Sequence, residues 1–244
     1  DLEDGCPADK KILAREELIN LLKENAFTKP VFIRVNDAMD AIGREDIDAI
    51  SPYQDQIEAI ILPKTQSFDF LATLAPMIDF SNKLVPLIET PRAIDTVTQI
   101  AAFKDVVGLF FGAADSSASL GCKLAWEPLL YARQKVVLAA AMYNLFTIDA
   151  PFFYIDDKEG LKKEAEAVKN LGFTGKAAIH PDQIDFINES FAPTSEEIAE
   201  GKKVLEEYQK SGGGAVKIDG QMVDEPIAEA MRLKISLGEE ENED

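Results

Sequence analysis

Histidine and cysteine are scarce in this chain of 244 residues, which contains only His180, Cys6 and Cys122. A single histidine excludes HExxH zinc sites and every other metal centre that needs several histidines. Two cysteines cannot form a disulfide framework, and this scarcity favours the reducing cytoplasm. A divalent metal would therefore be held by carboxylates, which favours hard ions such as Mg²⁺ or, as an alternative, Mn²⁺.

Basic residues are also few, because 25 lysines and arginines stand against 44 aspartates and glutamates and the net charge is −19. Nucleic acids and anionic membranes bind to basic patches, so we expect neither as a partner. No apolar run approaches the roughly 18 residues that span a bilayer, and we expect no signal peptide. Solubility is the simplest explanation for the excess of acid.

Several catalytic and nucleotide-binding motifs are missing. No GxGxxG sequence follows a predicted strand, and residues 172–177 depart from the P-loop pattern in both spacing and final residue. A Ser-His-Asp triad would have to use His180, and no GxSxG elbow accompanies it. These absences argue against a doubly wound nucleotide-binding fold and against a serine hydrolase.

Short apolar, β-branched runs alternate with longer amphipathic segments. This alternation predicts a parallel sheet with helices outside it. The predicted strands are Val31–Val35, Ala59–Leu62, Leu84–Ile88, Val106–Phe111, Leu145–Ile148 and Lys176–Ile179. The predicted helices are Ala8–Lys23, Phe68–Met77, Pro91–Phe103, Pro128–Tyr143 and Lys158–Leu171. Two helix starts are marked by caps, Thr90 before a proline and Thr194 in a capping box with Glu197.

The number of strand–helix units predicts a (β/α)₈ TIM barrel. Six strands are followed by helices, and residues 1–4 read as the end of a further strand, so we expect the first βα unit to be missing from this chain. We predict a TIM-barrel domain over residues 1–192, a helical extension over 193–238 and an acidic, disordered tail over 239–244.

In such a barrel, the residues just past the carboxyl ends of the strands line the active site. An acid at such a position can also be a helix cap or a solvated loop charge. Glu89 is harder to explain in that way, because Thr90 already supplies the cap and a buried carboxylate must be paired or bound to a metal. The polar residues at these positions are Glu3, Asp4, Arg34, Asn36, Lys64, Glu89, Asp115, Asp149 and His180.

Two of these acids predict a magnesium site. Asp115 follows the small residues 112–114, which allow a ligand close to the backbone. Asp115 and Glu89 come from neighbouring strands, and water could complete the shell of a Mg²⁺ ion held by them. Arg34 lies among apolar residues and needs an anionic partner, either a structural carboxylate or the substrate. We interpret His180 as a structural residue of a turn and Lys176 as an ion-pair partner inside the barrel.

Nine motifs occur in an order that resembles the citrate lyase β-subunit-like group of the HpcH/HpaI aldolase family. That group includes citryl-CoA, malyl-CoA and citramalyl-CoA lyases. The resemblance runs nearly from end to end of the chain, which makes it more specific than any single motif. The motifs are Asp1–Gly5, Phe32–Asn36, Ile61–Thr65, Leu87–Arg92, Gly112–Asp115, Tyr131–Arg133, Gly172–Lys176, Ala178–Pro181 and Asp219–Pro226.

The resemblance implies a Mg²⁺-dependent carbon–carbon lyase that cleaves a short β-hydroxyacyl thioester to an acetyl thioester and an oxo acid. It implies that Glu89 and Asp115 bind the metal and that Arg34 contacts the substrate and the enolate. It also implies that Glu3 and Asp4 act as catalytic residues that order the water around the metal.

The resemblance further implies that Asp224 is the general acid/base and comes from a neighbouring subunit, so we expect a homotrimer or higher homo-oligomer. The substrate-binding residues it predicts are Arg34, Asn36, Lys64, Gly112 and Ala113. The thioester partner would be an acyl-CoA or an acyl-carrier protein, and the hydroxyacyl group stays open among citryl, malyl and citramalyl. A non-catalytic assembly or acyl-carrier-binding subunit with the same fold is the alternative.

Overall fold

The computed structural model describes every residue except 79, 82, 213 and 241–244. The chain forms two compact units. The first unit comprises Asp1–Tyr154 and Ala167–Ile179, and the second comprises Ile155–Glu166 and the residues from His180 onward. One of the divisions between them falls inside helix α8 (Lys158–Leu171).

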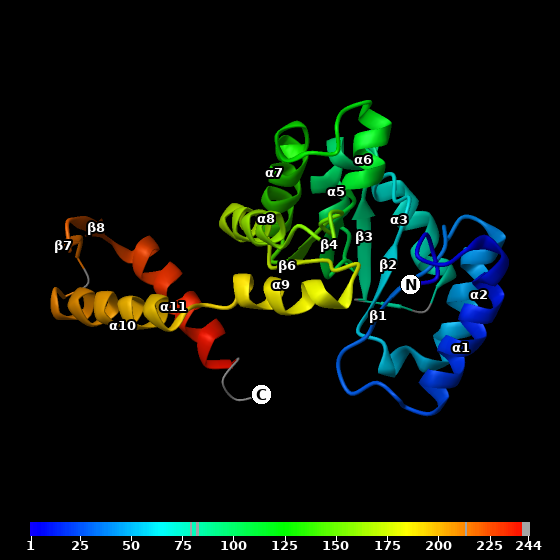
Figure 1. Ribbon diagram of the computed structural model, residues 1–244, viewed down its shortest axis with the longest axis horizontal. Helices are drawn as coiled ribbons and strands as arrows, with labels where there is room; N and C mark the ends of the chain where they lie inside the picture. The colour runs from blue at the N-terminus through cyan, green and yellow to red at the C-terminus, as the bar shows by residue number, and fades with distance from the viewer. Residues whose placement is uncertain (79, 82, 213, 241–244) are drawn as a thin grey trace. The chain divides into compact units, whose positions relative to one another are not determined.

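The first unit is built on a six-stranded parallel sheet whose strands follow one another in chain order (Figure 1). Each strand pairs with the next one in the sequence, as in a (β/α) barrel. The predicted strands Ala59–Leu62 and Leu84–Ile88 are confirmed residue for residue. The strands are β1 (Phe32–Arg34), β2 (Ala59–Leu62), β3 (Leu84–Ile88), β4 (Gly108–Phe111), β5 (Phe146–Asp149) and β6 (Gly175–Lys176).

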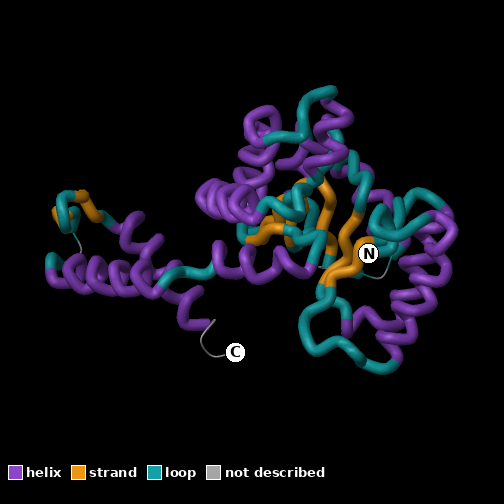
Figure 2. Tube along the Cα trace, viewed as in Figure 1, coloured by secondary structure: helices purple, strands orange, loops and turns teal. Residues whose placement is uncertain are grey.

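Helices lie around this sheet (Figure 2). In α7, apolar residues recur at helical spacing, from Leu129 through Ala132 and Val136 to Ala140, and all four are buried. The α-helices are α1 (Lys11–Lys23), α2 (Ala41–Ile50), α3 (Phe68–Leu74), α4 (Pro91–Asp95), α5 (Val97–Ala101), α6 (Ala113–Leu120) and α7 (Trp126–Met142). The short 3₁₀ helices are η1 (Ala8–Lys10), η2 (Ser51–Gln56) and η3 (Ala75–Met77).

Strands β2 and β3 are buried along their whole length, as expected for a parallel sheet that is covered on both faces. Alternate residues of neighbouring strands share one face and form an apolar cluster with Phe110 and Phe146. Gly108 is required beneath the Phe146 ring, since a Cβ there would lie 2.3 Å from a ring atom. The buried members of this cluster are Ala59, Ile61, Val85 and Leu87.

A buried charge cluster lies where β5 and β6 end. Arg133 Nε donates a hydrogen bond to Asp149 Oδ1 at 2.7 Å, and Lys176 Nζ donates to Asp149 Oδ2 at 2.9 Å. The guanidinium of Arg133 also lies 4.8 Å from the Trp126 ring centroid and 5.2 Å from that of Phe111. The predicted ion pair of Lys176 inside the barrel is therefore confirmed, and both carboxylate oxygens of Asp149 are paired with buried cations of the chain.

The second unit contains a pair of long helices and a hairpin. The predicted capping box is confirmed, because Thr194 Oγ1 accepts a hydrogen bond from Glu197 N and Glu197 Oε2 accepts one from Thr194 N. Its elements are η4 (Pro181–Gln183), α9 (Ile184–Phe191), α10 (Ser195–Lys210), β7 (Val216–Ile218), β8 (Gln221–Val223) and α11 (Glu225–Glu240). The core residues of this unit are Val204, Tyr208, Ile218, Val223 and Ala228.

The predicted domain limits do not coincide with the limits of these units. The boundary at residue 192 lies within the second unit, and α11 continues to Glu240, two residues into the predicted acidic tail. The rest of that tail, 241–244, lies outside the described residues. At the other end, Leu2 N donates a hydrogen bond to Arg34 O beside β1. Among the described residues, no helix combines the length and apolar character that crossing a bilayer requires.

Candidate active site

Several of the predicted site residues come together at the carboxyl ends of β1 to β4. Arg34 is the last residue of β1, Lys64 follows β2, Glu89 directly follows β3 and Gly112 directly follows β4. Parallel strands place these ends at one edge of the sheet, so residues 25 to 51 positions apart in sequence come into contact.

Glu89 is the most deeply buried acid of this group, with only 2% of its surface exposed. Its Oε1 accepts a hydrogen bond from Lys64 N at 2.7 Å. Burial raises the pKa of Glu89 to about 7, and the neighbouring Asp115 adds to the rise, whereas the backbone and ammonium of Lys64 oppose it. A carboxyl in this state gains strongly from a cation that neutralises it.

Lys64 places one positive charge among three carboxylates. Its Nζ lies 3.2 Å from Asp115 Oδ2, 3.5 Å from Glu89 Oε1 and 3.8 Å from Glu3 Oε1. Partial burial opposes the charged form, but Glu89 and Asp115 outweigh it and raise the pKa of Lys64. The backbone of Lys64 is left-handed, with a φ of 55°, and its N–H bonds to Glu89 in this conformation. The three acids surround a cation already, and their charge exceeds that of the single ammonium.

Gly112 allows the chain to pass close to Glu89. A Cβ at this position would lie 2.6 Å from Glu89 Cβ and 3.0 Å from Glu89 Oε2, closer than real side chains approach. Helix α6 begins immediately after this glycine and carries Asp115 in its first turn. The glycine therefore lets β4 deliver Asp115 next to Glu89.

Arg34 is held by two acids from the start of the chain. Its Nε and Nη2 donate to Asp1 Oδ1 and Oδ2 at 2.8 and 2.5 Å, and its Nη1 lies 3.1 Å from Glu3 Oε2. Of the two kinds of anionic partner that the sequence leaves open for Arg34, the structure shows carboxylates of the chain itself. Its side chain is still 24% exposed and lines the cavity described below, so contact with a substrate remains open to it.

A cavity of about 330 Å³ opens beside these residues. Its lining combines the charged groups Asp1, Asp4, Arg34, Glu89 and Asp115 with largely apolar residues. Gly112 and Ala113 of this lining are predicted from the sequence, whereas Asp1 and the aromatic residues Phe110 and Phe153 are not. The remaining lining residues are Gly5, Leu87, Phe110, Phe111, Gly112, Ala113, Ala114, Pro151, Phe153 and Ile179.

Asn36 is not among the residues that line this cavity. Its side chain donates to Leu2 O at 2.8 Å and to Asp46 Oδ2 at 2.6 Å, and its Oδ1 accepts from Lys11 Nζ. These contacts use the amide inside the protein, so they give no support to the predicted contact between Asn36 and a substrate.

Two further predicted residues belong to the second unit. Asp224 precedes α11, and its Oδ1 accepts a hydrogen bond from Ile227 N at 3.4 Å. His180 precedes η4, and its Nδ1 accepts a hydrogen bond from Asp182 N at 3.2 Å. The structural interpretation of His180 is thus confirmed, whereas the catalytic role of Asp224 stays a prediction.

The residues present fit a hard divalent ion better than a transition metal. Among the described residues, no group of three or more histidines, cysteines, aspartates and glutamates is arranged to hold a metal. A carboxylate pair such as Glu89 and Asp115 is suited to Mg²⁺, which usually keeps several waters and takes only one or two carboxylates from the protein. The excess negative charge around Lys64 also favours binding of a divalent cation.

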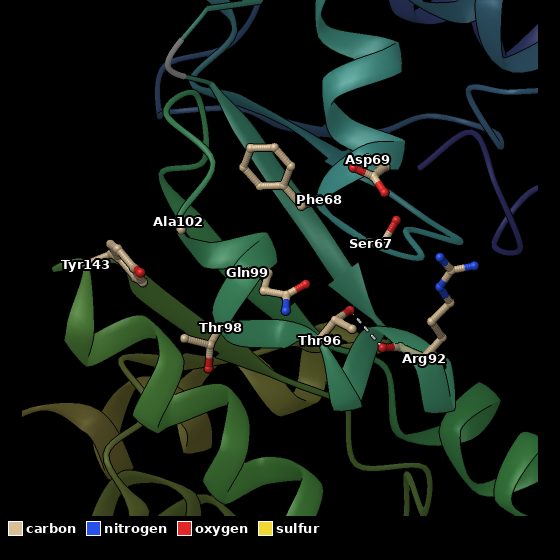
Figure 3. Close-up of a pocket in the computed structure, with 9 residues that line it drawn as sticks. All are labelled: Ser67, Phe68, Asp69, Arg92, Thr96, Thr98, Gln99, Ala102 and Tyr143. Carbon is tan, nitrogen blue, oxygen red and sulfur yellow. Dashed lines mark hydrogen bonds between the residues drawn. The ribbon is translucent and has the colours of Figure 1, made fainter.

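A second, more open pocket lies elsewhere in the first unit (Figure 3). It has a volume of about 400 Å³ and is lined by Ser67, Arg92, Gln99 and Tyr143, among others. Thr96 lies between the two helices at its floor and bonds through Oγ1 to Arg92 O at 2.9 Å. This pocket has one acid, Asp69, and therefore no carboxylate pair.

Comparison with known proteins identifies the family and the fold. The model of the HpcH/HpaI aldolase/citrate lyase family matches residues 1–181. The chain belongs to this family. It is 30% identical to the mitochondrial citramalyl-CoA lyase of Homo sapiens, over 97% of this chain and 77% of that protein. It is also 30% identical to the citrate lyase subunit beta of Haemophilus influenzae, over 96% of this chain and 85% of that protein.

Solved structures of relatives confirm the TIM-barrel class. RipC from Yersinia pestis is 40% identical, with a TM-score of 0.72 over 81% of this chain and 89% of that chain. The CitE protein of Mycobacterium tuberculosis is 29% identical, with a TM-score of 0.81 over 98% of this chain and 88% of that chain. That CitE structure was solved in complex with magnesium, acetoacetate and coenzyme A.

Proposed function

We propose that this chain is a Mg²⁺-dependent carbon–carbon lyase that cleaves a short β-hydroxyacyl thioester to an acetyl thioester and an oxo acid. The observation that carries the proposal is the pair Glu89 and Asp115, which lines one cavity together with Arg34 at the carboxyl ends of the strands. Family membership and the magnesium in the CitE relative support it. The presence of both carboxylates disfavours a non-catalytic assembly or carrier-binding subunit.

Most of the charged groups in and beside the cavity have a task in retro-aldol cleavage. A Mg²⁺ ion held by Glu89 and Asp115 would lower the pKa of the substrate hydroxyl and polarise the carbonyl that forms. Arg34 donates to the oxygen on which enolate charge develops, and loss of such a donor typically costs about 3 kcal/mol of barrier. Glu3 and Asp1 hold the guanidinium of Arg34 in place for that contact. Lys64 offsets part of the negative charge, so that an anionic substrate can enter.

The enolate must then be protonated at carbon, and we assign this step to Asp224 of a neighbouring copy in a homotrimer or higher homo-oligomer. The assignment rests on the resemblance to the family and leads to a complementation test. Asp224→Asn chains and Glu89→Gln chains are each expected to be inactive, and mixed oligomers of the two should regain activity. Persistent inactivity of correctly assembled mixed oligomers would contradict delivery of Asp224 between subunits.

The cavity also favours one class of hydroxyacyl group. Its uncharged lining residues include Leu87, Phe110 and Phe153, and Arg34 is the one cationic side chain among the described lining residues. A citryl group would bring an additional carboxylate next to apolar side chains and four acids, and Lys64 is already paired with two of those acids. We therefore propose a substrate whose acid part has one carboxylate and a small apolar substituent, as in citramalyl-CoA, and a reaction in the cytoplasm.

The test is an assay of the purified protein with Mg²⁺ against citryl-, malyl- and citramalyl-CoA. We expect release of acetyl-CoA and pyruvate from citramalyl-CoA to be fastest and to be lost when EDTA removes the metal. Faster release of oxaloacetate from citryl-CoA would overturn the choice of substrate. Inactivity towards all three groups, both as CoA and as carrier-protein thioesters, would overturn the lyase proposal and favour the non-catalytic alternative.

A further inference from the structure

The ammonium of Lys11 is bound by three oxygens of the segment around the active site. Lys11 is the first residue of α1, and its Nζ donates to Leu2 O and Glu3 O, both at 3.2 Å, and to Asn36 Oδ1. An ammonium has three N–H donors, and these three oxygens use all of them. Two of the three are backbone carbonyls, so Lys11 fixes the course of the chain at residues 2 and 3.

A buried carboxylate supports this arrangement from behind. Asp46 of α2 is fully buried and accepts hydrogen bonds from Asn36 N at 2.9 Å and from Asn36 Nδ2 at 2.6 Å. Arg15 of α1 neutralises Asp46, with Nε 2.6 Å from Asp46 Oδ1. Asn36 Nδ2 also donates to Leu2 O. Helices α1 and α2 and the residues after β1 thus hold the start of the chain through hydrogen bonds and a buried ion pair.

The segment held in this way carries the acid that links Arg34 to Lys64. Glu3 is 6% exposed, and its two carboxylate oxygens lie 3.1 Å from Arg34 Nη1 and 3.8 Å from Lys64 Nζ. Because the backbone of Glu3 is bound by Lys11, a shift of that backbone would move the carboxylate away from both cations. Lys11 itself is not among the residues that line the cavity.

We propose that Lys11 is a positioning residue that, together with Asn36 and Asp46, holds Glu3 against Arg34 and Lys64. The expected effect on turnover rests on the proposed function. The contacts by which Lys11, Asn36 and Asp46 hold residues 2 and 3, which we call the clamp, are a property of the fold. The proposal also gives Asn36 a different task from the substrate contact that the sequence predicts. Residues that hold an active-site group in place through hydrogen bonds typically contribute about 10-fold to 100-fold to activity or metal affinity.

The first arm of the test measures the clamp without using activity. Cys6 follows the clamped segment, its N–H donates to Glu3 O, and the chain has one other cysteine, Cys122. Lys11→Met is expected to speed maleimide modification of Cys6 several-fold while the rate at Cys122 stays constant. The matched control is Lys10→Met, since Lys10 is exposed and adjacent. An unchanged Cys6 rate in folded Lys11→Met protein would overturn the proposal.

The second arm tests whether Lys11 acts through Glu3. Lys11→Met is expected to lower kcat about 10-fold with little change in KM. In a Glu3→Gln background the same substitution should cost little more, because residues that act as one unit are not additive. Full additivity would overturn the proposal. An inactive wild type would count against the proposed function alone, because the labelling arm would still decide about the clamp.

A second variant covers the case in which Lys11→Met fails to fold. Asn36→Ala removes the oxygen that Lys11 binds and leaves the lysine in place. We expect this variant to fold, to show faster Cys6 modification and lower kcat, and to melt at a lower temperature, because buried Asp46 and Leu2 O lose the amide donor. Wild-type values for both quantities in Asn36→Ala would contradict the proposal as directly as the lysine variant.

Discussion

At the scale of single residues, the site depends on the close contacts that a buried carboxylate makes with a glycine and a lysine. Glu89 is buried against Gly112 on one side and Lys64 on the other, so its carboxylate has little freedom to move. The rise of its pKa to about 7 shows that burial outweighs the two contacts from Lys64. A second cation near Glu89 would relieve this burial cost, which is the physical reason to expect a metal there.

Gly112 offers the sharpest test at this scale. Gly112→Ala is expected to push Glu89 out of place and to weaken Mg²⁺ binding about 10-fold or more, because the new Cβ would overlap Glu89 Cβ. Gly175→Ala is the matched control, since the space around a Cβ at 175 is open. Calorimetric titration with Mg²⁺ measures both variants. Equal affinity of Gly112→Ala and wild type would show that Glu89 is not a ligand.

At the scale of elements, the caps and strands explain why the chain folds locally as it does. The capping box at Thr194 begins α10, and Thr90 Oγ1 accepts a hydrogen bond from Ala93 N at the start of α4. Thr194→Ala is expected to destabilise the folded protein by about 1 kcal/mol, whereas Ser195→Ala, at the next and exposed position, should change little. Urea unfolding measures both. An equal loss in the two variants would contradict the capping role.

The same elements show what the sequence could predict. Strands β2 and β3 and helix α8 are predicted to the residue, because apolar periodicity is a local signal. The helix expected over residues 91–103 is instead α4 and α5, separated at Thr96, whose Oγ1 bonds back to Arg92 O. Helix α2 was not predicted, although Asp40 before it is a residue type that caps helices. Helix α6 was not predicted either, because its small and polar residues read as a turn.

The site, too, has residues that the sequence predicts and contacts that it does not predict. The strand-end rule finds these residues from their positions: Arg34 ends β1, Glu89 comes directly after β3, Lys64 two residues after β2 and Asp115 four residues after β4. It cannot show that Asp1 meets Arg34, which is 33 residues away, or that the amide of Asn36 is already engaged. Such contacts depend on the packing of α1 and α2 against the strand ends. Local sequence patterns contain no information about that packing.

At the scale of the whole molecule, the net charge of −19 acts on any anionic substrate. Coenzyme A carries phosphates, so we expect its thioesters to be repelled at long range and this repulsion to be screened by salt. The KM for a CoA thioester should therefore fall as the salt concentration rises from about 20 to about 200 mM. The corresponding pantetheine thioester, which lacks most of that charge, is the control and should respond less. A rise of KM with salt for CoA alone would show local attraction by a basic cluster.

The central claim is that Glu89 binds the metal on which cleavage depends, and a titration of Mg²⁺ combined with the lyase assay tests it most directly. The variants to compare are Glu89→Gln and Glu58→Gln, because Glu58 is exposed and precedes β2 at the opposite end of the strands. We expect Glu89→Gln to lose both Mg²⁺ binding and turnover while it stays folded, and Glu58→Gln to keep both. Wild-type binding and turnover in Glu89→Gln would contradict the claim.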